Sequence, residues 1–143
     1  MDNEMISKMG FMMEQALGSM TSLLAAGFKA QGIDLPHSQY AVLRLLYTCN
    51  EPLTQIKIAE ILKKDASAIK RTVDILERKG LVERKALNGR TNCVICTDKA
   101  FALKDAVTAT ANETLQMIFC DFTNEELKDF ANILNRISES KNG

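Results

Sequence analysis

The sequence predicts a mainly α-helical protein with one small β-hairpin. Three observations between residues 52 and 97 lead to this prediction. Two consecutive segments carry apolar residues at helical spacing, and an Asn-Gly pair then separates two short strand-like runs. Helix, helix and hairpin in this order make a winged helix-turn-helix, and the long segments on either side read as further helices.

The first short helix is expected to begin after Thr54, whose hydroxyl suits an N-cap. Its apolar face is assigned to Leu53, Ile56, Ile58, Ala59, Ile61 and Leu62. These residues recur at the spacing of a short amphipathic helix.

The second short helix has one apolar stripe and a polar, basic face opposite to it. The stripe consists of Ile69, Val73 and Leu76, at positions i, i+4 and i+7. Ser67 and Arg71 project from the opposite face with Lys70 beside them, and Gly80 ends the helix. In a helix-turn-helix, the N-terminal half of the second helix enters the major groove of DNA.

The hairpin is predicted from strands over residues 81–84 and 92–97, joined by a turn at Asn88-Gly89. Asparagine and glycine tolerate the positive φ angles that tight hairpin turns need. The hairpin is therefore the expected wing.

Three sequence patterns resemble the MarR family of bacterial transcription regulators. They are Gln39-Tyr40-Ala41-Val42-Leu43, then Asp65-x-Ser67-x-x-x-Arg71-x-x-Asp74-x-Leu76-Glu77, and Leu-Val-Glu-Arg directly after Glu-Arg-Lys-Gly. The resemblance covers about residues 35–97 and implies a DNA-binding regulator rather than an enzyme. It also implies that the flanking helices form a dimer, and that a small-molecule effector binds near the junction of the first helices with residues 35–97.

The candidate DNA-binding residues are Thr54, Gln55, Ser67, Lys70, Arg71 and Arg90. Lys70 and Arg71 can donate to guanine edges or phosphates, and the N–H groups at a helix start, beside Thr54 and Gln55, suit a phosphate. Arg90 matches the family arginine that reaches the minor groove, whose narrow form attracts cations.

Asp65 has two interpretations: the resemblance implies that it orients the wing arginine by an ion pair, and its position also suits an N-cap of the second helix. Two departures from the family pattern stand out. Lys63 occupies the turn position where the family commonly has glycine, and a left-handed backbone there would cost about 1 kcal/mol. The wing is about two residues shorter than usual, with Asn88 in place of an acidic residue.

Charge is unevenly distributed along a chain whose net charge is zero. Residues 54–97 carry ten Lys or Arg and five Asp or Glu, a net of +5. Residues 1–53 carry three and five, and residues 98–143 carry five and eight, which gives −2 and −3. A basic patch within a neutral chain is a footprint of nucleic-acid binding.

The 143 residues are expected to form a single domain, residues 1–143. Within it, the winged helix-turn-helix at about residues 35–97 is the segment expected to read DNA, and it is called the reader segment below. Dimerisation helices are expected at about 4–31 and 98–140. The first segment carries a methionine-rich apolar stripe, and the second contains a capping box at residues 123–126. A dimer would present two recognition helices to a pseudo-palindromic double-stranded operator. No signal peptide or membrane span is evident, so we expect a cytoplasmic protein without a membrane partner.

The four cysteines are expected to be reduced and buried. They are Cys49, Cys93, Cys96 and Cys120. Cys93 and Cys96 are three apart on a predicted strand and so should face opposite sides, and only one histidine is present; neither a metal site nor a cofactor is expected. No catalytic motif is found.

The sequence thus favours a dimeric repressor relieved by a small molecule. One alternative is a winged helix that binds protein. Another is a thiol-based redox sensor, which is weakened because that branch of the family carries its reactive cysteine in the first helix, and residues 1–31 contain none.

Overall fold

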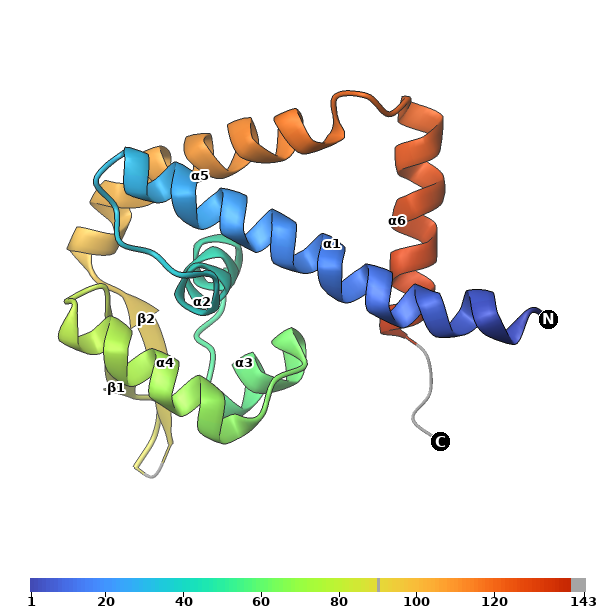
Figure 1. Ribbon diagram of the computed structural model, residues 1–143. Helices are drawn as coiled ribbons and strands as arrows, with labels where there is room; N and C mark the ends of the chain where they lie inside the picture. Colours follow the sequence, from blue (N-terminus) through green and yellow to red (C-terminus); the bar gives the residue numbers. More distant parts are fainter. Residues whose placement is uncertain (90, 140–143) are drawn as a thin grey trace.

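The computed structural model describes residues 1–89 and 91–139, and within them it contains six helices and one two-stranded hairpin (Figure 1). The elements are α1 (Asn3–Ala30), α2 (His37–Thr48), α3 (Gln55–Leu62), α4 (Ala66–Arg78), β1 (Val82–Ala86), β2 (Asn92–Cys96), α5 (Asp98–Phe119) and α6 (Asn124–Ser138). The predicted fold class, mainly α with a hairpin wing, is confirmed.

Local sequence signals set most of the helix ends. Thr54, Thr97 and Thr123 each cap a helix by accepting a hydrogen bond from a backbone N–H group of the first turn. Glu126 completes the predicted capping box by accepting from the Thr123 N–H group. Gly32 follows Gln31, the C-cap residue of α1, and has φ +74°, a left-handed backbone that glycine adopts without strain.

The core lies around α2, which packs against the C-terminal half of α1 and against α4, α5 and β2. The largest fully buried side chains are Phe28, Val42, Leu43, Ile58, Val73, Leu76, Val82, Val94 and Val107. They come from both ends of the chain as well as its middle, so a single core joins α1 and α5 to the reader segment.

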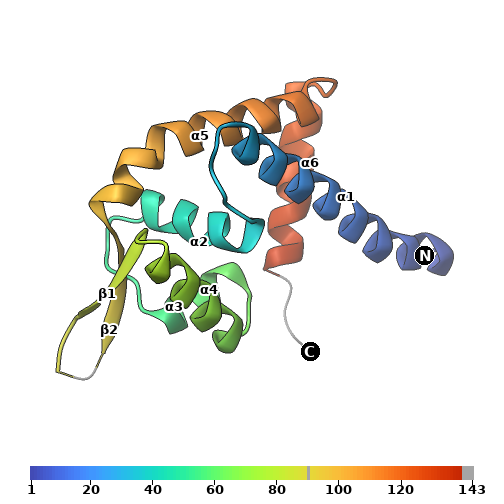
Figure 2. The same cartoon turned by 60° about the vertical axis from the view of Figure 1, so that its left-hand side comes forward.

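The first and fifth helices pack closely against each other above the reader segment (Figures 1 and 2). A Cβ atom built on Gly27 would lie 3.0 Å from Thr114 Oγ1 and 3.2 Å from Thr110 Cγ2. Glycine at position 27 therefore permits the helices to approach. The small residues of α5 near this contact include Thr110 and Ala111, which are buried.

The prediction for Leu53 was wrong. It does not belong to the apolar face of α3; it lies before the helix and forms an antiparallel bridge with Val94, whose N–H donates to the Leu53 carbonyl at 2.8 Å. Of the other residues assigned to that face, Ile58 and Ala59 are buried, but Ile56 is 67 % exposed and Ile61 42 %. A single turn of contact suffices for α3, because it is only eight residues long.

Two long apolar surfaces remain uncovered in the isolated chain. The N-terminal half of α1 projects past the core, and α6 stands apart from the reader segment with no buried residue (Figure 1). The exposed apolar side chains there include Met5, Met9, Met12, Met13 and Leu17 on α1, and Phe130, Ile133, Leu134 and Ile137 on α6. Both surfaces belong to the segments predicted to dimerise.

Candidate nucleic-acid interface

The recognition helix α4 is oriented by its apolar stripe. Ile69, Val73 and Leu76 are all buried against the core. The opposite face therefore points to solvent, and the three predicted contact residues Ser67, Lys70 and Arg71 are exposed on it. The structure thus brings these three side chains together at the N-terminal half of one exposed helix face.

The start of α3 presents the other predicted pair. Thr54 is the N-cap residue, and its hydroxyl oxygen accepts from the Lys57 N–H at 3.1 Å. Gln55 is the first residue of the helix, but its Oε1 atom already accepts from Arg84 Nε at 2.8 Å. Its side-chain N–H₂ group remains the part of Gln55 that could donate to a phosphate.

Arg84, a residue that sequence reasoning passed over, connects the reader's elements. From β1 it donates to Asp74 Oδ1 at 2.6 Å, to Glu77 Oε1 at 2.8 Å, and to Gln55 on α3. Its side chain is only 20 % exposed. The available signal was strand alternation: Arg84 follows the buried Val82 by two positions, so it should face the same side.

The carboxylate of Asp74 is held between two cations. The hydrogen bond from Arg84 is the main reason that the pKa of Asp74 lies below its usual value, and Lys70, whose Nζ lies 3.4 Å from Oδ2, acts in the same direction. Lys70 is thus held in an ion pair within its own helix, whereas Arg71 makes no ion pair with any residue that the structure describes.

Among the described residues 54–97, four cations form no ion pair, Arg71 included. Of the nine Lys and Arg described between residues 54 and 97, Lys57, Lys70, Lys79, Arg84 and Lys85 have carboxylate partners. The other four, Lys63, Lys64, Arg71 and Arg78, are exposed and form no ion pair with a described residue. Three of the four lie in the turn before α4 or in its N-terminal half.

Asp65 occupies the N-cap position of α4, but its side chain makes no capping hydrogen bond. The expected ion pair would join it to Arg90, which lies outside the described residues together with any contact to the minor groove. Its wing-orienting role therefore stays a prediction. The described part of the wing pairs β1 and β2 antiparallel, with Lys85 opposite Cys93.

A small cavity of about 240 Å³ lies between α2 and α5. Tyr40, Arg44 and Tyr47 line it from α2, and Lys104 lines it from α5 with its Nζ 5.8 Å from the Tyr47 ring centre. Burial raises the pKa of Tyr47 to about 12, so this phenol is neutral at physiological pH and donates to the Ala100 carbonyl at 2.6 Å. Two cations and two neutral phenols therefore face one cavity.

The cysteines differ from expectation in their burial. All four are free, but only Cys93 is buried; Cys49 and Cys96 are half-buried and Cys120 is exposed. Cys120 comes directly after α5, at a turn where no element covers it. Among residues 1–89 and 91–139, no group of three His, Cys, Asp or Glu side chains is placed to hold a metal ion.

Within the same described residues, no helix combines the length and apolar character needed to cross a membrane. The sequence profile of the MarR family matches residues 35–89, which run from the start of α2 to the wing.

Solved structures share the fold along nearly the whole chain. A probable transcriptional regulator from Pseudomonas aeruginosa has a TM-score of 0.80 at 28 % identity, covering 90 % of this chain and 95 % of its own. CouR from Rhodococcus jostii RHA1, bound to p-coumaroyl-CoA, has a TM-score of 0.81 at 23 % identity and covers 94 % of both chains. MepR from S. aureus, in a complex with DNA, has a TM-score of 0.79 at 22 % identity. The match covers 89 % of this chain and 93 % of the MepR chain.

The last two likenesses concern the fold alone, because their identity is low. The match to the family profile adds evidence from the sequence itself, because it covers residues 35–89 of the reader segment. Together they confirm the predicted resemblance: residues 35–89 match the MarR family, whose members are transcription regulators and not enzymes.

Proposed function

We propose that the protein is a dimeric, sequence-specific DNA-binding repressor that acts in the cytoplasm and is released from its operator by a small molecule. The observation that carries DNA binding is the exposed N-terminal half of α4, where Ser67, Lys70 and Arg71 share one face. A helix presented in this way fits the major groove, and a bidentate arginine contact there selects guanine.

The other proposed contacts surround this helix. Thr54 and Gln55 at the start of α3 are assigned to phosphate, and Arg90 at the wing tip to the minor groove. Asp65 is assigned to the orientation of Arg90. MepR, whose structure with DNA has the same fold, supports this class of partner for the chain.

Selection of DNA from a random pool by the purified protein tests the proposal. We expect a pseudo-palindrome to be enriched, because two protomers would present two recognition helices. Arg71→Ala should then weaken binding to the selected site more than to random DNA, by about 1–3 kcal/mol per half-site. The matched control is Arg136→Ala on α6, which should leave both affinities unchanged.

Failure to enrich any sequence would contradict the proposal. A winged helix that binds protein would then be the better account of the same exposed face, because the unpaired cations of α4 could also meet an acidic protein surface.

The cavity between α2 and α5 is the proposed effector site. Arg44 and Lys104 would pair with an anion, and the rings of Tyr40 and Tyr47 would contact an aromatic body. Its volume lies below the usual range for ligand sites, so we assign it only a small aromatic carboxylate. CouR, which has this fold, is a ligand-bound relative.

The position of this cavity suggests how an effector would act. α2 packs against α4 on one side and lines the cavity on the other. A ligand that binds one arrangement of α2 and α5 better than another shifts the chain toward it, and the recognition helix moves with α2.

Calorimetry with 4-hydroxybenzoate, and with uncharged 4-hydroxybenzamide as control, tests the site. We expect only the carboxylate to bind and to weaken operator binding, and Lys104→Met to abolish both effects. Equal behaviour of the acid and the amide would contradict the assignment of an anion.

A further inference from the structure

Lys63 is the one non-glycine residue with positive φ among those that the structure describes. It follows α3 with φ 56° and ψ 45°, in the left-handed region. The closing turn of the helix requires this conformation: the Lys63 N–H donates to the carbonyls of Ala59 and Glu60, and the Lys64 N–H donates to Ala59 at 3.0 Å. Helices commonly end in this pattern, and glycine is the residue that fits it without strain.

Among the residues that the structure describes, the lysine side chain has no polar partner that would offset this strain. It is exposed, and it forms no hydrogen bond or ion pair with the described part of the chain. Glycine would satisfy the same backbone bonds at lower cost. A strained residue whose side chain adds nothing to stability is a candidate for function.

The place of Lys63 in the fold indicates which function. It lies in the turn of the helix-turn-helix, two residues before the N-cap of α4. When a recognition helix enters the major groove by its N-terminal end, the first helix crosses the sugar-phosphate backbone at the groove's edge. The turn that joins the two helices is then held beside that backbone.

We propose that Lys63 binds a DNA phosphate at the edge of the major groove, and that the chain gives up stability at this turn in exchange for that contact. The inference rests on the proposed function, since it adds a contact to the same interface. Lys63 would add to affinity without adding to sequence preference, because phosphates carry no base identity.

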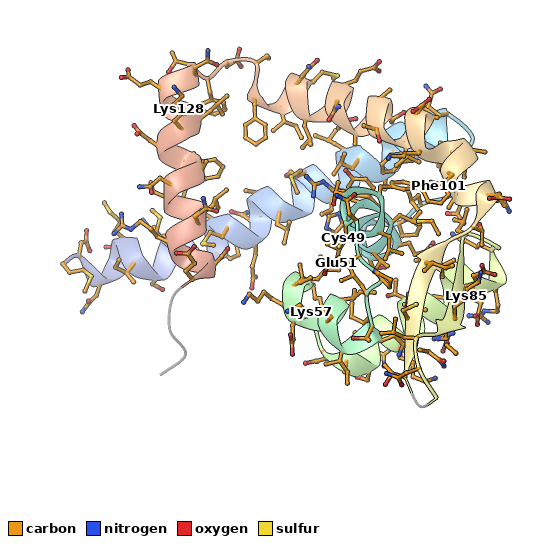
Figure 3. The ribbon with its side chains drawn as sticks, turned by 180° about the vertical axis from the view of Figure 1, so that it is seen from behind. Cys49, Glu51, Lys57, Lys85, Phe101 and Lys128 are labelled. Carbon is orange, nitrogen blue, oxygen red and sulfur yellow. The ribbon has the colours of Figure 1, made fainter. Side chains whose placement is uncertain are left out.

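Three variants separate stability from charge. Lys63→Gly removes both the strain and the cation, while Lys63→Arg keeps both. Lys128→Gln removes one cation from α6, far from the reader segment (Figure 3), and controls for net charge. Each is compared with the wild type in thermal unfolding, and in binding to selected and random duplexes over a range of salt concentration.

We expect Lys63→Gly to melt at a higher temperature and to bind both duplexes several-fold more weakly. Its slope of log affinity against log salt should be shallower by about 0.9 per protomer, the value for one lost phosphate contact. Lys63→Arg should match the wild type in melting and in salt slope, and Lys128→Gln should leave the salt slope unchanged.

The outcomes against the inference are distinct from those against DNA binding. If the wild type binds DNA and Lys63→Gly binds with the same affinity and slope, the phosphate contact is refuted and the proposed function stands. An equal loss of DNA affinity in Lys128→Gln would assign the effect to net charge and refute the phosphate contact. A Lys63→Gly variant that melts no higher than the wild type would refute the claim that the lysine costs stability at this turn. A wild type that binds neither duplex refutes the proposed function and this contact with it.

Discussion

Arg84 decides how the side chains of the reader are arranged around one another. It contacts α3 through Gln55, and α4 through Asp74 and Glu77, at distances of 2.6–2.8 Å. Asp74 in turn lies 3.4 Å from Lys70. Two proposed DNA contacts, Gln55 and Lys70, are therefore positioned through a single arginine that itself faces inward.

The first prediction concerns the titration of Asp74. Its pKa is depressed in the folded chain, chiefly by the Arg84 hydrogen bond, so the ion pair stabilises the fold above the unfolded pKa of about 3.9. That contribution is lost as pH falls through the folded pKa. Arg84→Met should raise the pKa of Asp74 toward its usual value, measured by NMR titration of the side-chain carboxyl.

Lys85→Met is the matched control. Lys85 (Figure 3) follows Arg84 on β1 but pairs with Glu83. It should leave the Asp74 titration where it is in the wild type. An Asp74 pKa that stays the same in Arg84→Met would show that Arg84 is not the main cause of the depression.

Arg84 and Leu53 show where prediction from the sequence reached its limit. The partners of Arg84 lie 7, 10 and 29 positions away, and Leu53 bridges to Val94 across the whole reader. Helix periodicity and capping act within one or two turns, so they could predict the bounds of α4 and the cap at Thr123. Contacts that depend on how distant elements meet carry no local signal.

The residues of the candidate interface were partly predictable for the same reason. The exposed face of α4 follows from its own buried stripe, so Ser67, Lys70 and Arg71 could be placed from the sequence. The resemblance to the MarR family marked Lys63 as a position where a left-handed backbone would carry a cost, and the structure has that backbone there. The engagement of Gln55 by Arg84 did not follow, because it needs the distance between α3 and β1.

At the scale of elements, Thr97 joins the end of α4 to the start of α5. It caps α5 by accepting from the Ala100 N–H at 3.3 Å, and its hydroxyl donates to the Gly80 carbonyl at 2.6 Å. Thr97→Ala should therefore lower the free energy of unfolding by about 2 kcal/mol, of which about 1 is the cap and about 1 the second bond. Thr97→Ser should retain both.

Thr123→Ala is the comparison, since Thr123 caps α6 through the box with Glu126 and contacts no other element through its hydroxyl among the described residues. It should cost about 1 kcal/mol. Urea unfolding at one fixed protomer concentration measures both variants. Equal costs would mean that the Thr97–Gly80 bond contributes nothing to stability.

Strand β2 carries two cysteines that the fold makes unreactive. Cys93 is buried, and burial raises the pKa of the Cys96 thiol to about 11. Because Cys93 is shielded by burial and the raised pKa keeps Cys96 in the unreactive thiol form, both should be alkylated by iodoacetamide at pH 7 roughly tenfold or more slowly than in the unfolded chain. Mass spectrometry of time-resolved digests measures the rates.

We also predict that peroxide leaves DNA binding unchanged, because residues 1–31 contain no cysteine and neither Cys49 nor Cys120 is among the proposed DNA contacts. A chain with Cys49, Cys96 and Cys120 changed to Ser and Cys93 to Ala should bind as the wild type does before and after peroxide. A peroxide response that is present in the wild type and absent from this variant would support the redox-sensor alternative.

At the scale of the whole molecule, charge and apolar surface are separated. Residues 54–97, the C-terminal part of the reader segment, hold a net charge of +5, and the residues on either side hold −2 and −3. The uncovered apolar side chains gather instead on α1 and α6. A contiguous run of exposed apolar side chains such as those on α1 and α6 is typical of a protein–protein interface. Because these helices lie apart from α4, a partner bound to them would leave the recognition helix free.

The last prediction follows from that separation: the chain is a homodimer held by α1, α5 and α6. Leu134 is 41 % exposed on the apolar face of α6, and Met12 is 53 % exposed on α1. Leu134→Asp or Met12→Asp would place a carboxylate in the interface twice, once from each protomer, at several kcal/mol per buried charge. Light scattering at micromolar concentration should give twice the chain mass for the wild type and the single mass for these variants.

Asn132→Asp is the control, because position 132 projects from the opposite face of α6 at helical spacing and adds the same charge. It should remain dimeric. The dissociated variants should still bind a single half-site weakly, since no part of α4 is changed, while their affinity for the two-site operator falls toward that of one half-site. A wild-type chain that is monomeric would contradict the predicted dimer. A Leu134→Asp variant that stays dimeric would show that the dimer surface lies elsewhere.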